Sequence, residues 1–344
     1  NKPFSDSFYL PFWVCVGVPY ADFISHPPFF FIDTKVAVKI YKQSFKTISA
    51  EDVAHYLSEI KVWQQLRHPN ICLYMGICIE DNETYILSEL LDNGSLQAYL
   101  AAVINQTRTL SWATKLNILK DVCRGMTCLH DRKPPISHRD LKPANILISS
   151  AMRGKISDFG LSKEFDFFAS QTAQVGTWLY MAPEVIRGDF YSLSCDIYSF
   201  SLCIYEIYTH IKPFSFAEGL SKKSENTKSS SSFSGDVSIQ IGSNTSKTSN
   251  HSKHSNSSSS RVTLPRGLQY QIANGHRPKL PAELCSDEFL KKNAGCDALI
   301  RLMQRCWDQD ADERPSFQEI VAIITNIQKL PTTNYETVVK DIFN

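Results

Sequence analysis

Residues 136–160 constrain the fold more than any other stretch of this sequence. They read ISHRDLKPANILISSAMRGKISDFG, in which Asp140 precedes one short apolar run and Asp158 follows another. Two such runs, separated by a turn that contains glycine, predict a pair of short strands. Because a hairpin brings its two ends together, Asp140, Lys142, Asn145 and Asp158 are expected to converge on one site.

The chemistry of these four side chains suits phosphoryl transfer. A carboxylate such as Asp140 can orient a hydroxyl, and the ammonium of Lys142 can neutralise charge on a phosphate. Asn145 and Asp158 offer the hard oxygen ligands that Mg²⁺ prefers. The simpler interpretation is a generic buried hairpin with surface charges. It would require His, Arg, Asp, Lys and Asn to occur together in one segment by chance.

The segments HRDLKPAN and DFG resemble the catalytic loop and the metal-binding loop of eukaryotic protein kinases. VAVK before them resembles a strand of the small kinase lobe, and GTWLYMAPE and CW–DERPSF resemble the tyrosine-kinase-like group, which includes Raf and mixed-lineage kinases. The resemblance covers about residues 34–328 apart from one insertion. It implies a bilobal α+β protein kinase fold, with a small β-rich lobe and a large, mainly helical lobe.

The resemblance also implies an activity, which is ATP- and Mg²⁺-dependent phosphorylation of Ser and Thr hydroxyls in protein substrates. Asp140 would orient the acceptor hydroxyl and accept its proton, and Lys142 would stabilise the transferring phosphoryl group. Asn145 and Asp158 would hold the metal. Lys142 stands two residues after Asp140, which is the serine/threonine form of the motif.

The resemblance places the nucleotide with Lys39 and Glu59. Lys39 lies in residues 34–40, whose alternation predicts a strand, and Glu59 lies in residues 49–66, whose apolar positions recur at helical spacing. In the family these two residues pair, and the lysine contacts the phosphates. A solvated strand lysine and a surface carboxylate are the simpler alternatives. Register alone adds five further nucleotide-binding positions: Ala37, Ser88, Glu89, Leu91 and Leu147.

The N-terminal 33 residues depart from the family. A kinase needs a glycine-rich loop before Lys39, because close approach of the backbone to the phosphates requires residues without a Cβ. Gly17 is the only glycine before Lys39, and the pattern GxGxxGxV is absent. A true loss, a divergent loop and a wrongly joined gene sequence all remain open. The rival to an active kinase is therefore a pseudokinase or scaffold that signals by binding.

Four further expectations follow from the resemblance. Glu184 should pair with Arg314, and Asp196 should hold the backbone of the catalytic loop. Ser170 and Thr172 are expected to be phosphorylated by an upstream kinase. A stacked apolar column that ties the lobes together is expected from Trp63, Tyr74, His138 and Phe159.

The sequence divides into six expected regions. Seventeen of the forty residues from 221 to 260 are serine, so this stretch cannot bury enough apolar surface to offset the entropy of ordering. The regions are an atypical N-terminal segment (1–33), the small lobe (34–91), the first part of the large lobe (92–216), a disordered insertion (217–264), the second part of the large lobe (265–330) and a C-terminal tail (331–344).

Composition narrows the partners and the compartment. Lys and Arg number 36 against 35 Asp and Glu, so no strong field favours nucleic acid or an anionic membrane. Ten cysteines without a CxxC pair favour reduced thiols and a cytoplasmic location. No apolar run reaches the roughly 20 residues of a membrane span, which a receptor kinase would need. Because residue 1 is Asn, the sequence is expected to be a piece of a longer chain.

Overall fold

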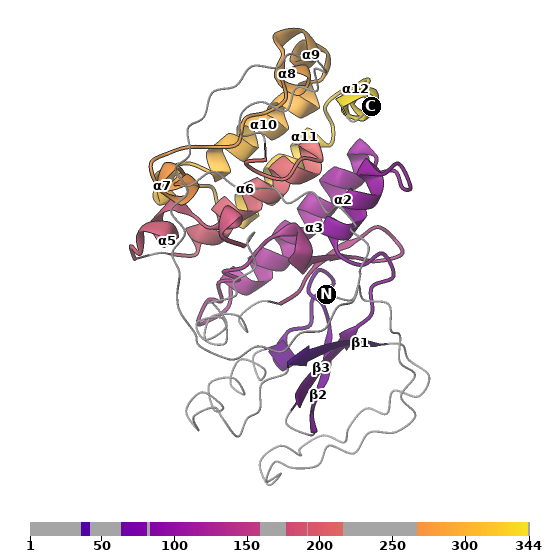
Figure 1. The fold of residues 1–344 in the computed structure, drawn as a ribbon, viewed down its shortest axis with the longest axis vertical. Helices are drawn as coiled ribbons and strands as arrows, with labels where there is room; N and C mark the ends of the chain where they lie inside the picture. Colours follow the sequence, from indigo (N-terminus) through magenta and orange to yellow (C-terminus); the bar gives the residue numbers. More distant parts are fainter. Residues whose placement is uncertain are drawn as a thin grey trace, which may run out of the picture.

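The fold is taken from a computed structural model that describes residues 36–41, 63–80, 83–158, 177–190, 192–215 and 267–342. Within these residues a small sheet lies at one end of the molecule, and a larger group of helices forms the rest (Figure 1). This arrangement confirms the α+β kinase fold that the sequence predicts, with a small β-rich region followed by a mainly helical one.

The small sheet has three antiparallel strands in the order β1-β3-β2. In the register of β1 with β3, Lys39 lies opposite Ile86, and Ala37 lies opposite Ser88. Ile86 is buried, so this part of the central strand packs towards the core. The strands are β1 (Val36–Tyr41), β2 (Tyr74–Glu80) and β3 (Glu83–Glu89).

Strand β2 begins three residues after the start of the apolar run that contains it. The apolar run starts at Ile71, but Ile71 forms an isolated parallel bridge with Ile156, and the Cys72 amide donates to the Ile156 carbonyl at 2.8 Å. The backbone of residues 71–72 is thus used to join the small sheet to the hairpin predicted around Asp158. The regular strand starts at Tyr74, with a bulge between Tyr74 and Gly76.

The predicted hairpin is formed by β4 (Ile146–Ile148) and β5 (Gly154–Ile156), and the short 3₁₀ helix η2 (Pro143–Asn145) precedes it. The sequence places Gly154 in the turn, but the structure shows it as the first residue of β5. A Cβ on Gly154 would lie 3.2 Å from the carbonyl oxygen of Ile118. The glycine therefore lets the hairpin pass close to the long helix that carries Ile118.

Two helices organise the large lobe. Helix α3 (Trp112–His130) begins after Ser111, whose hydroxyl accepts from the Thr114 amide at 3.2 Å and caps the helix. Helix α6 (Ser194–Thr209) is buried from its second residue to its last, so it runs through the centre of the lobe.

The remaining helices surround α3 and α6 (Figure 1). They are α2 (Leu96–Ile104), α5 (Pro183–Arg187), α7 (Leu268–Ala273), α8 (Ala282–Cys285), α9 (Asp287–Lys292), α10 (Ala294–Cys306), α11 (Phe317–Ile327) and α12 (Tyr335–Ile342), with 3₁₀ turns η4 (Thr177–Tyr180) and η5 (Ala311–Glu313).

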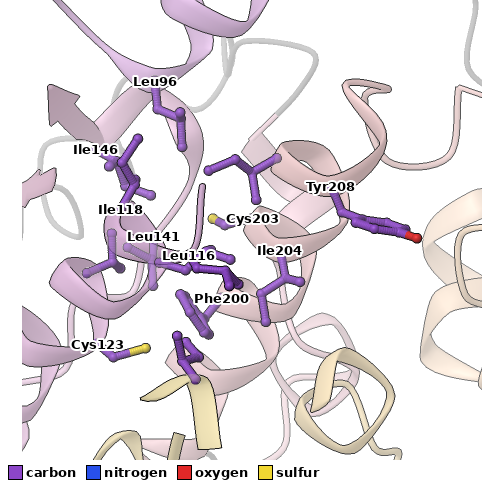
Figure 2. Packing of buried hydrophobic residues seen from close by; sticks show 14 of the residues in the cluster. Leu96, Leu116, Ile118, Cys123, Leu141, Ile146, Phe200, Cys203, Ile204 and Tyr208 are labelled. Carbon is purple, nitrogen blue, oxygen red and sulfur yellow. The ribbon is translucent and has the colours of Figure 1, made fainter. Parts of the chain in front are cut away.

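The core of the large lobe forms where α3, α6 and the hairpin meet. Leu116 and Ile118 from α3 lie beside Phe200 and Ile204 from α6 and Ile146 from β4, and all five are at most 1% exposed (Figure 2). Full burial of each such side chain contributes about 1.5–3 kcal/mol relative to exposure. The hairpin is therefore fixed by the same core that holds the helices together.

Several predicted features lie outside the described residues. They are the N-terminal segment 1–33, Glu59, Phe159, Ser170, Thr172 and the insertion 217–264. Within the described part of the chain, no helix combines the length and the apolar character that crossing a bilayer requires.

Candidate active site

Asp140 is the centre of a small polar cluster. Lys142 Nζ lies 2.8 Å from Asp140 Oδ2, and Asn145 Nδ2 donates to the same oxygen at 2.8 Å. Asn145 Nδ2 also donates to the backbone carbonyl of Asp140 at 2.8 Å. The Asp140 and Lys142 side chains remain 18% and 16% exposed. The carboxylate is thus held in place and still reachable from solvent.

Asp158 lies next to this cluster because β5 ends there. The Ser157 amide and hydroxyl both donate to the Asn145 carbonyl, at 2.9 and 3.1 Å, so the end of β5 is joined to the start of β4. Asp158 follows with φ of 59°, a left-handed conformation that few residues other than glycine adopt. The structure therefore brings the ends of the hairpin together, as the sequence predicts.

Lys39 reaches the same place from the small sheet. Its Nζ lies 2.7 Å from Asp158 Oδ1, which joins β1 to the residue just beyond β5. The two side chains are 43% and 29% exposed, so this ion pair faces solvent. The predicted pairing of Lys39 with Glu59 lies outside the described residues.

Asp196 holds the backbone of the catalytic loop. It is fully buried at the start of α6, and its carboxylate accepts from the amides of His138 and Arg139, both at 2.8 Å. Ser137 Oγ and His130 Nε2 contact the same carboxylate, at 3.0 and 2.9 Å. Burial alone would raise the pKa of Asp196, but the hydrogen bond from His130 and the other donors lower it below its ordinary value. Asp196 therefore stays ionised.

Three of the five further nucleotide-binding positions that the sequence predicts, Ser88, Glu89 and Leu91, lie at the end of β3 or just beyond it, and Glu89 carries an additional contact. Lys155 Nζ lies 2.7 and 2.8 Å from the two carboxylate oxygens of Glu89, and the Leu73 amide donates to Glu89 Oε1 at 2.7 Å. Lys155 is on β5, three residues before Asp158. The end of β3 is thus tied to the strand that leads to the candidate metal ligand. Leu147 lies on β4 opposite Lys155, and its side chain is half-buried.

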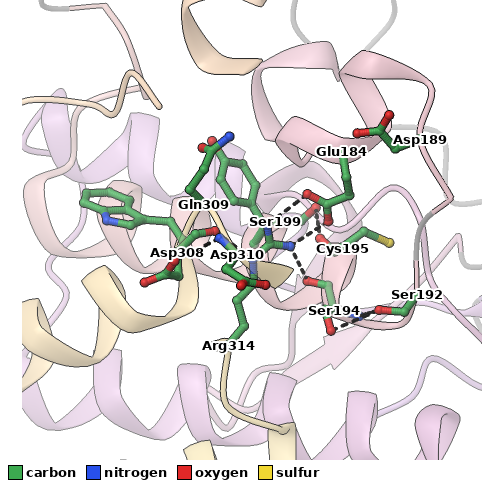
Figure 3. Close-up of polar contacts among 12 residues, drawn as sticks. Glu184, Asp189, Ser192, Ser194, Cys195, Ser199, Asp308, Gln309, Asp310 and Arg314 are labelled. Atoms are coloured by element: carbon green, nitrogen blue, oxygen red, sulfur yellow. Dashed lines mark hydrogen bonds and ion pairs between the residues drawn. The ribbon is translucent and has the colours of Figure 1, made fainter. Parts of the chain in front are cut away.

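A buried ion pair closes the segment that follows the site. Arg314 donates to both carboxylate oxygens of Glu184, at 2.7 and 2.9 Å, and also to the Ser194 carbonyl at 3.0 Å (Figure 3). The Arg314 and Glu184 side chains are 0% and 7% exposed. Two parallel hydrogen bonds in a buried place fix the direction of both groups.

A second buried contact anchors the same segment on α6. Tyr180 donates from its hydroxyl to Glu206 Oε2, and its backbone carbonyl accepts from Ser199 Oγ at 2.8 Å. Burial raises the pKa of Glu206 to about 7, although the hydrogen bond from Tyr180 opposes this shift. Residues 177–184 are therefore attached to the central helix at several points.

Part of the expected apolar column is present. Trp63 and Tyr74 are buried, and their ring centroids lie 5.3 Å apart. His138 is fully buried in the catalytic loop. The fourth member, Phe159, lies outside the described residues.

Three contacts of the site were not expected from the sequence. One is the pair of Lys155 with Glu89, and another is the hydrogen bond of His130 with Asp196. The third joins Asp121 on α3 to Arg153 in the hairpin turn, at 2.6 and 2.7 Å. Lys155 and Glu89 are 66 positions apart, and no local pattern links residues at that distance. The one signal for these contacts in the sequence is Asp121, a charged residue on the otherwise apolar face of α3.

The site residues fit a magnesium ion. Asn145 uses its amide nitrogen to contact Asp140, which leaves its carbonyl oxygen as the ligand atom, and Asp158 supplies a carboxylate. Mg²⁺ is commonly held by one or two protein oxygens together with substrate phosphates. Within the described residues no cluster of three or more His, Cys, Asp or Glu side chains offers a metal site.

A small antiparallel sheet, a mainly helical region and this cluster of carboxylate, ammonium and amide groups agree with the family that the comparison identifies. The Protein kinase domain family matches residues 32–323 of the chain, and the chain therefore belongs to the protein kinase family. It is 30% identical over 296 residues to the dual specificity protein kinase shkC of Dictyostelium discoideum. The aligned region covers 85% of this chain and 46% of that protein.

Two other relatives show the range of the similarity. The serine/threonine-protein kinase VIK of Arabidopsis thaliana is 29% identical over 312 residues, covering 88% of this chain and 57% of that protein. The seven transmembrane domain-containing tyrosine-protein kinase 1 of Dictyostelium discoideum is 40% identical over 185 residues, covering 52% of this chain and 26% of that protein. The chain thus spans about half, or less, of the length of most of these relatives.

Proposed function

We propose that the chain is an active protein kinase that transfers the γ-phosphate of ATP to Ser and Thr hydroxyls of protein substrates. The observation that carries this proposal is the cluster at the ends of the hairpin. Asp140 lies within 2.8 Å of Lys142 and Asn145, and Asp158 lies within 2.7 Å of Lys39. A scaffold that only binds would have no need of this complete set.

Each residue has one task in the proposed reaction. Asp140 accepts a hydrogen bond from the substrate hydroxyl and takes its proton as the oxygen attacks the γ-phosphorus and the bond to ADP breaks. Lys142, 2.8 Å from Asp140, places positive charge beside the group in transfer. Lys39 aligns the α- and β-phosphates of ATP. Once Asp158 holds the metal, Glu59 takes its place as the partner of Lys39.

The other ligands of ATP follow from the same proposal. Asn145 and Asp158 would hold Mg²⁺, which when bound neutralises charge on the phosphates. Ser88, Glu89 and Leu91 would border the adenine through the end of β3. The opposite walls of the adenine pocket would come from Ala37 and Leu147.

The preference for Ser and Thr rests on Lys142, which follows Asp140 by two residues. VIK, by its name, is a serine/threonine kinase, whereas the names of the other two relatives indicate dual specificity and tyrosine kinases. Phosphotyrosine in the product would therefore contradict the proposed preference for Ser and Thr, but it would leave the proposed kinase activity in place.

The regulation and setting of the enzyme are further parts of the proposal. An upstream kinase would act on Ser170 or Thr172, and the six regions given by the sequence would form the two lobes, the insertion and the ends. The eight cysteines whose side chains the structure describes are free thiols, which supports a cytoplasmic location. The near balance of charge supports protein substrates over nucleic acid.

The test is transfer of labelled γ-phosphate by the purified chain to itself and to a generic basic protein. We expect label on Ser and Thr after acid hydrolysis, and no label when Mg²⁺ is chelated. A chain that binds ATP with a thermal shift but transfers no label would contradict the proposal and support the pseudokinase alternative.

The absent glycine pattern before Lys39 favours that alternative and needs its own experiment. Backbone amides of a glycine loop normally cover the phosphates, and scattered prolines and aromatics in residues 1–33 are unsuited to that task. Replacing residues 1–33 with the glycine-loop strand pair of a related kinase should raise the turnover by roughly tenfold or more. Equal turnover of the two forms would show that the natural N-terminal segment already covers the phosphates.

A further inference from the structure

Helix α12 lies beyond residue 323, where the match to the protein kinase family ends, yet it is docked on the large lobe (Figure 1). Tyr335 is completely buried, and Val339 is 3% exposed. The Tyr335 ring stacks on Tyr208 with centroids 5.3 Å apart and meets Trp112 edge-on at 4.9 Å. One aromatic side chain thus fixes the start of the helix.

A buried lysine lies directly beneath this aromatic contact. Lys115 on α3 is 1% exposed, and its Nζ lies 2.7 Å from the Tyr335 hydroxyl and 2.5 Å from His210 Nε2. The Tyr335 hydroxyl donates in turn to the Tyr208 carbonyl. Among the ion pairs of the described residues, none includes Lys115. Its amine is therefore surrounded by neutral hydrogen-bonding groups, and an ammonium in such a place is costly.

The groups around Lys115 come from three elements, and α12, which carries Tyr335, is the first of them. Tyr208 and His210 belong to α6 and its end, and Cys296 faces Lys115 from α10. Burial raises the pKa of the Tyr208 and Tyr335 phenols, and burial raises that of the Cys296 thiol to about 12, so all three stay neutral.

Among the described residues, Glu336 is the carboxylate whose charge acts on Lys115. Glu336 on α12 accepts from the Trp112 amide at 2.8 Å, and its charge opposes the effect of burial on Lys115 only in part. Burial lowers the pKa of Lys115 to about 7, and burial and the charge of Lys115 lower that of His210 to about 2. Both bases are thus driven towards their neutral forms when α12 is docked.

We propose that α12 is a proton-responsive latch, whose docking to the large lobe strengthens as Lys115 loses its proton. Release of the helix would expose Lys115 to water, where the ammonium is favoured, and would uncover the aromatic face formed by Trp112 and Tyr208. Docking of α12 therefore disfavours the protonated form of Lys115, and protonation of Lys115 disfavours docking.

The sign and size follow from linkage. The released state binds a proton on Lys115 up to its ordinary pKa of 10.5, whereas the docked state loses it at about 7. Docking is therefore weakest below pH 7 and strengthens by up to tenfold per pH unit above it. Between pH 7 and 8.5 the ratio of docked to released helix should rise ~15-fold. His210 adds to this effect. Below its ordinary pKa of 6.5 it gains a proton more readily in the released state, so docking weakens further as the pH falls.

The test is amide hydrogen exchange of the full chain, with the protection of residues 335–342 corrected for the intrinsic pH dependence of exchange. We expect protection to rise ~15-fold from pH 7 to 8.5 in the wild type and to stay flat in Lys115→Met. Lys329→Met is the matched control, because it removes an exposed lysine just before α12 and should keep the wild-type slope.

Three results would overturn the proposal. The first is the absence of a pH-dependent rise in the wild type, and the second is a rise that persists in Lys115→Met. The third is the same slope at amides of the buried helix α6, which would report global stability in place of a local latch. Should Lys115→Met fail to fold, NMR titration of the wild-type lysine carbons decides the matter. A buried lysine that titrates near 7 supports the latch, and one that titrates near 10.5 contradicts it.

Discussion

Two charged contacts of this molecule differ sharply in their surroundings. Glu184 and Arg314 form a buried, two-fold hydrogen-bonded pair within the large lobe, with side chains that are at most 7% exposed. Lys39 and Asp158 form an ion pair between the small sheet and the residue just beyond the hairpin, with side chains that are 43% and 29% exposed. The first fixes the scaffold, whereas the second can break and re-form.

The catalytic loop belongs with the first kind of contact. Asp196 is fully buried and accepts from two backbone amides of the loop, so contacts within the large lobe help to set the position of Asp140. Lys39, by contrast, reaches the site only through the small sheet. The large lobe therefore presents a preformed catalytic loop, and the nucleotide-binding side depends on how the two lobes meet.

Arg314→Ala should have the largest effect on stability. It leaves the Glu184 carboxylate buried without its partner, and breaking a buried pair in this way costs about 3–5 kcal/mol. Urea unfolding measures the loss. Arg301→Ala is the matched control, because it removes an exposed partner of Asp297 and should cost at most about 0.5 kcal/mol. Similar losses in both variants would contradict the distinction.

Asp196→Asn should have a smaller effect on stability and a large one on activity. The substitution keeps the shape but replaces one acceptor oxygen with a donor, which leaves a loop amide without a partner at a cost of about 1–3 kcal/mol. Because that amide positions Asp140, phosphate transfer should fall together with stability. A variant that unfolds more easily but turns over normally would show that α6 does not position the loop.

Lys39→Met should scarcely change stability. An exposed ion pair contributes about 0.2–1 kcal/mol, so the unfolding free energy should fall by no more than that amount. Transfer from ATP should nevertheless be lost, because no other charge of β1 would meet the phosphates. A loss of several kcal/mol would show that the contact with Asp158 is part of the rigid scaffold after all.

Deletion of residues 221–260 should have the smallest effect. Shortening a polar connection changes the entropy of loop closure only slowly with length, by about 0.6 kcal/mol for each halving. Thermal melting and turnover should match those of the full chain. A large drop in melting temperature would show that the insertion packs against the large lobe.

The comparison of the two contacts also explains how far the sequence could predict the structure. The hairpin around Asp140 and Asp158 was predicted because its signals are local, with apolar runs and turn residues in order. Glu184 with Arg314 and Asp196 with the loop were predicted from family motifs, although 130 positions separate the first pair. Each of these contacts belongs to the part of the chain with the strongest resemblance.

Other contacts lacked any such signal. The ion pair of Lys155 with Glu89 joins two residues that read separately as solvated strand positions. Lys115 interrupts the apolar face of α3, and a lysine there is ordinarily read as exposed. Its burial depends on Tyr335, in an interval that the sequence predicts as a tail and the structure shows as α12. Periodicity cannot predict which distant helix will cover a polar residue.

The most direct test of the account is Asp140→Asn. The variant keeps the shape of the side chain and one oxygen that can accept from Lys142 and Asn145, but it removes the carboxylate proposed to accept the hydroxyl proton. Phosphate transfer should fall by about 10²–10⁴-fold, while the thermal shift on adding ATP and Mg²⁺ stays within error of the wild type. Transfer that persists at the wild-type rate would contradict the assigned role of the catalytic loop.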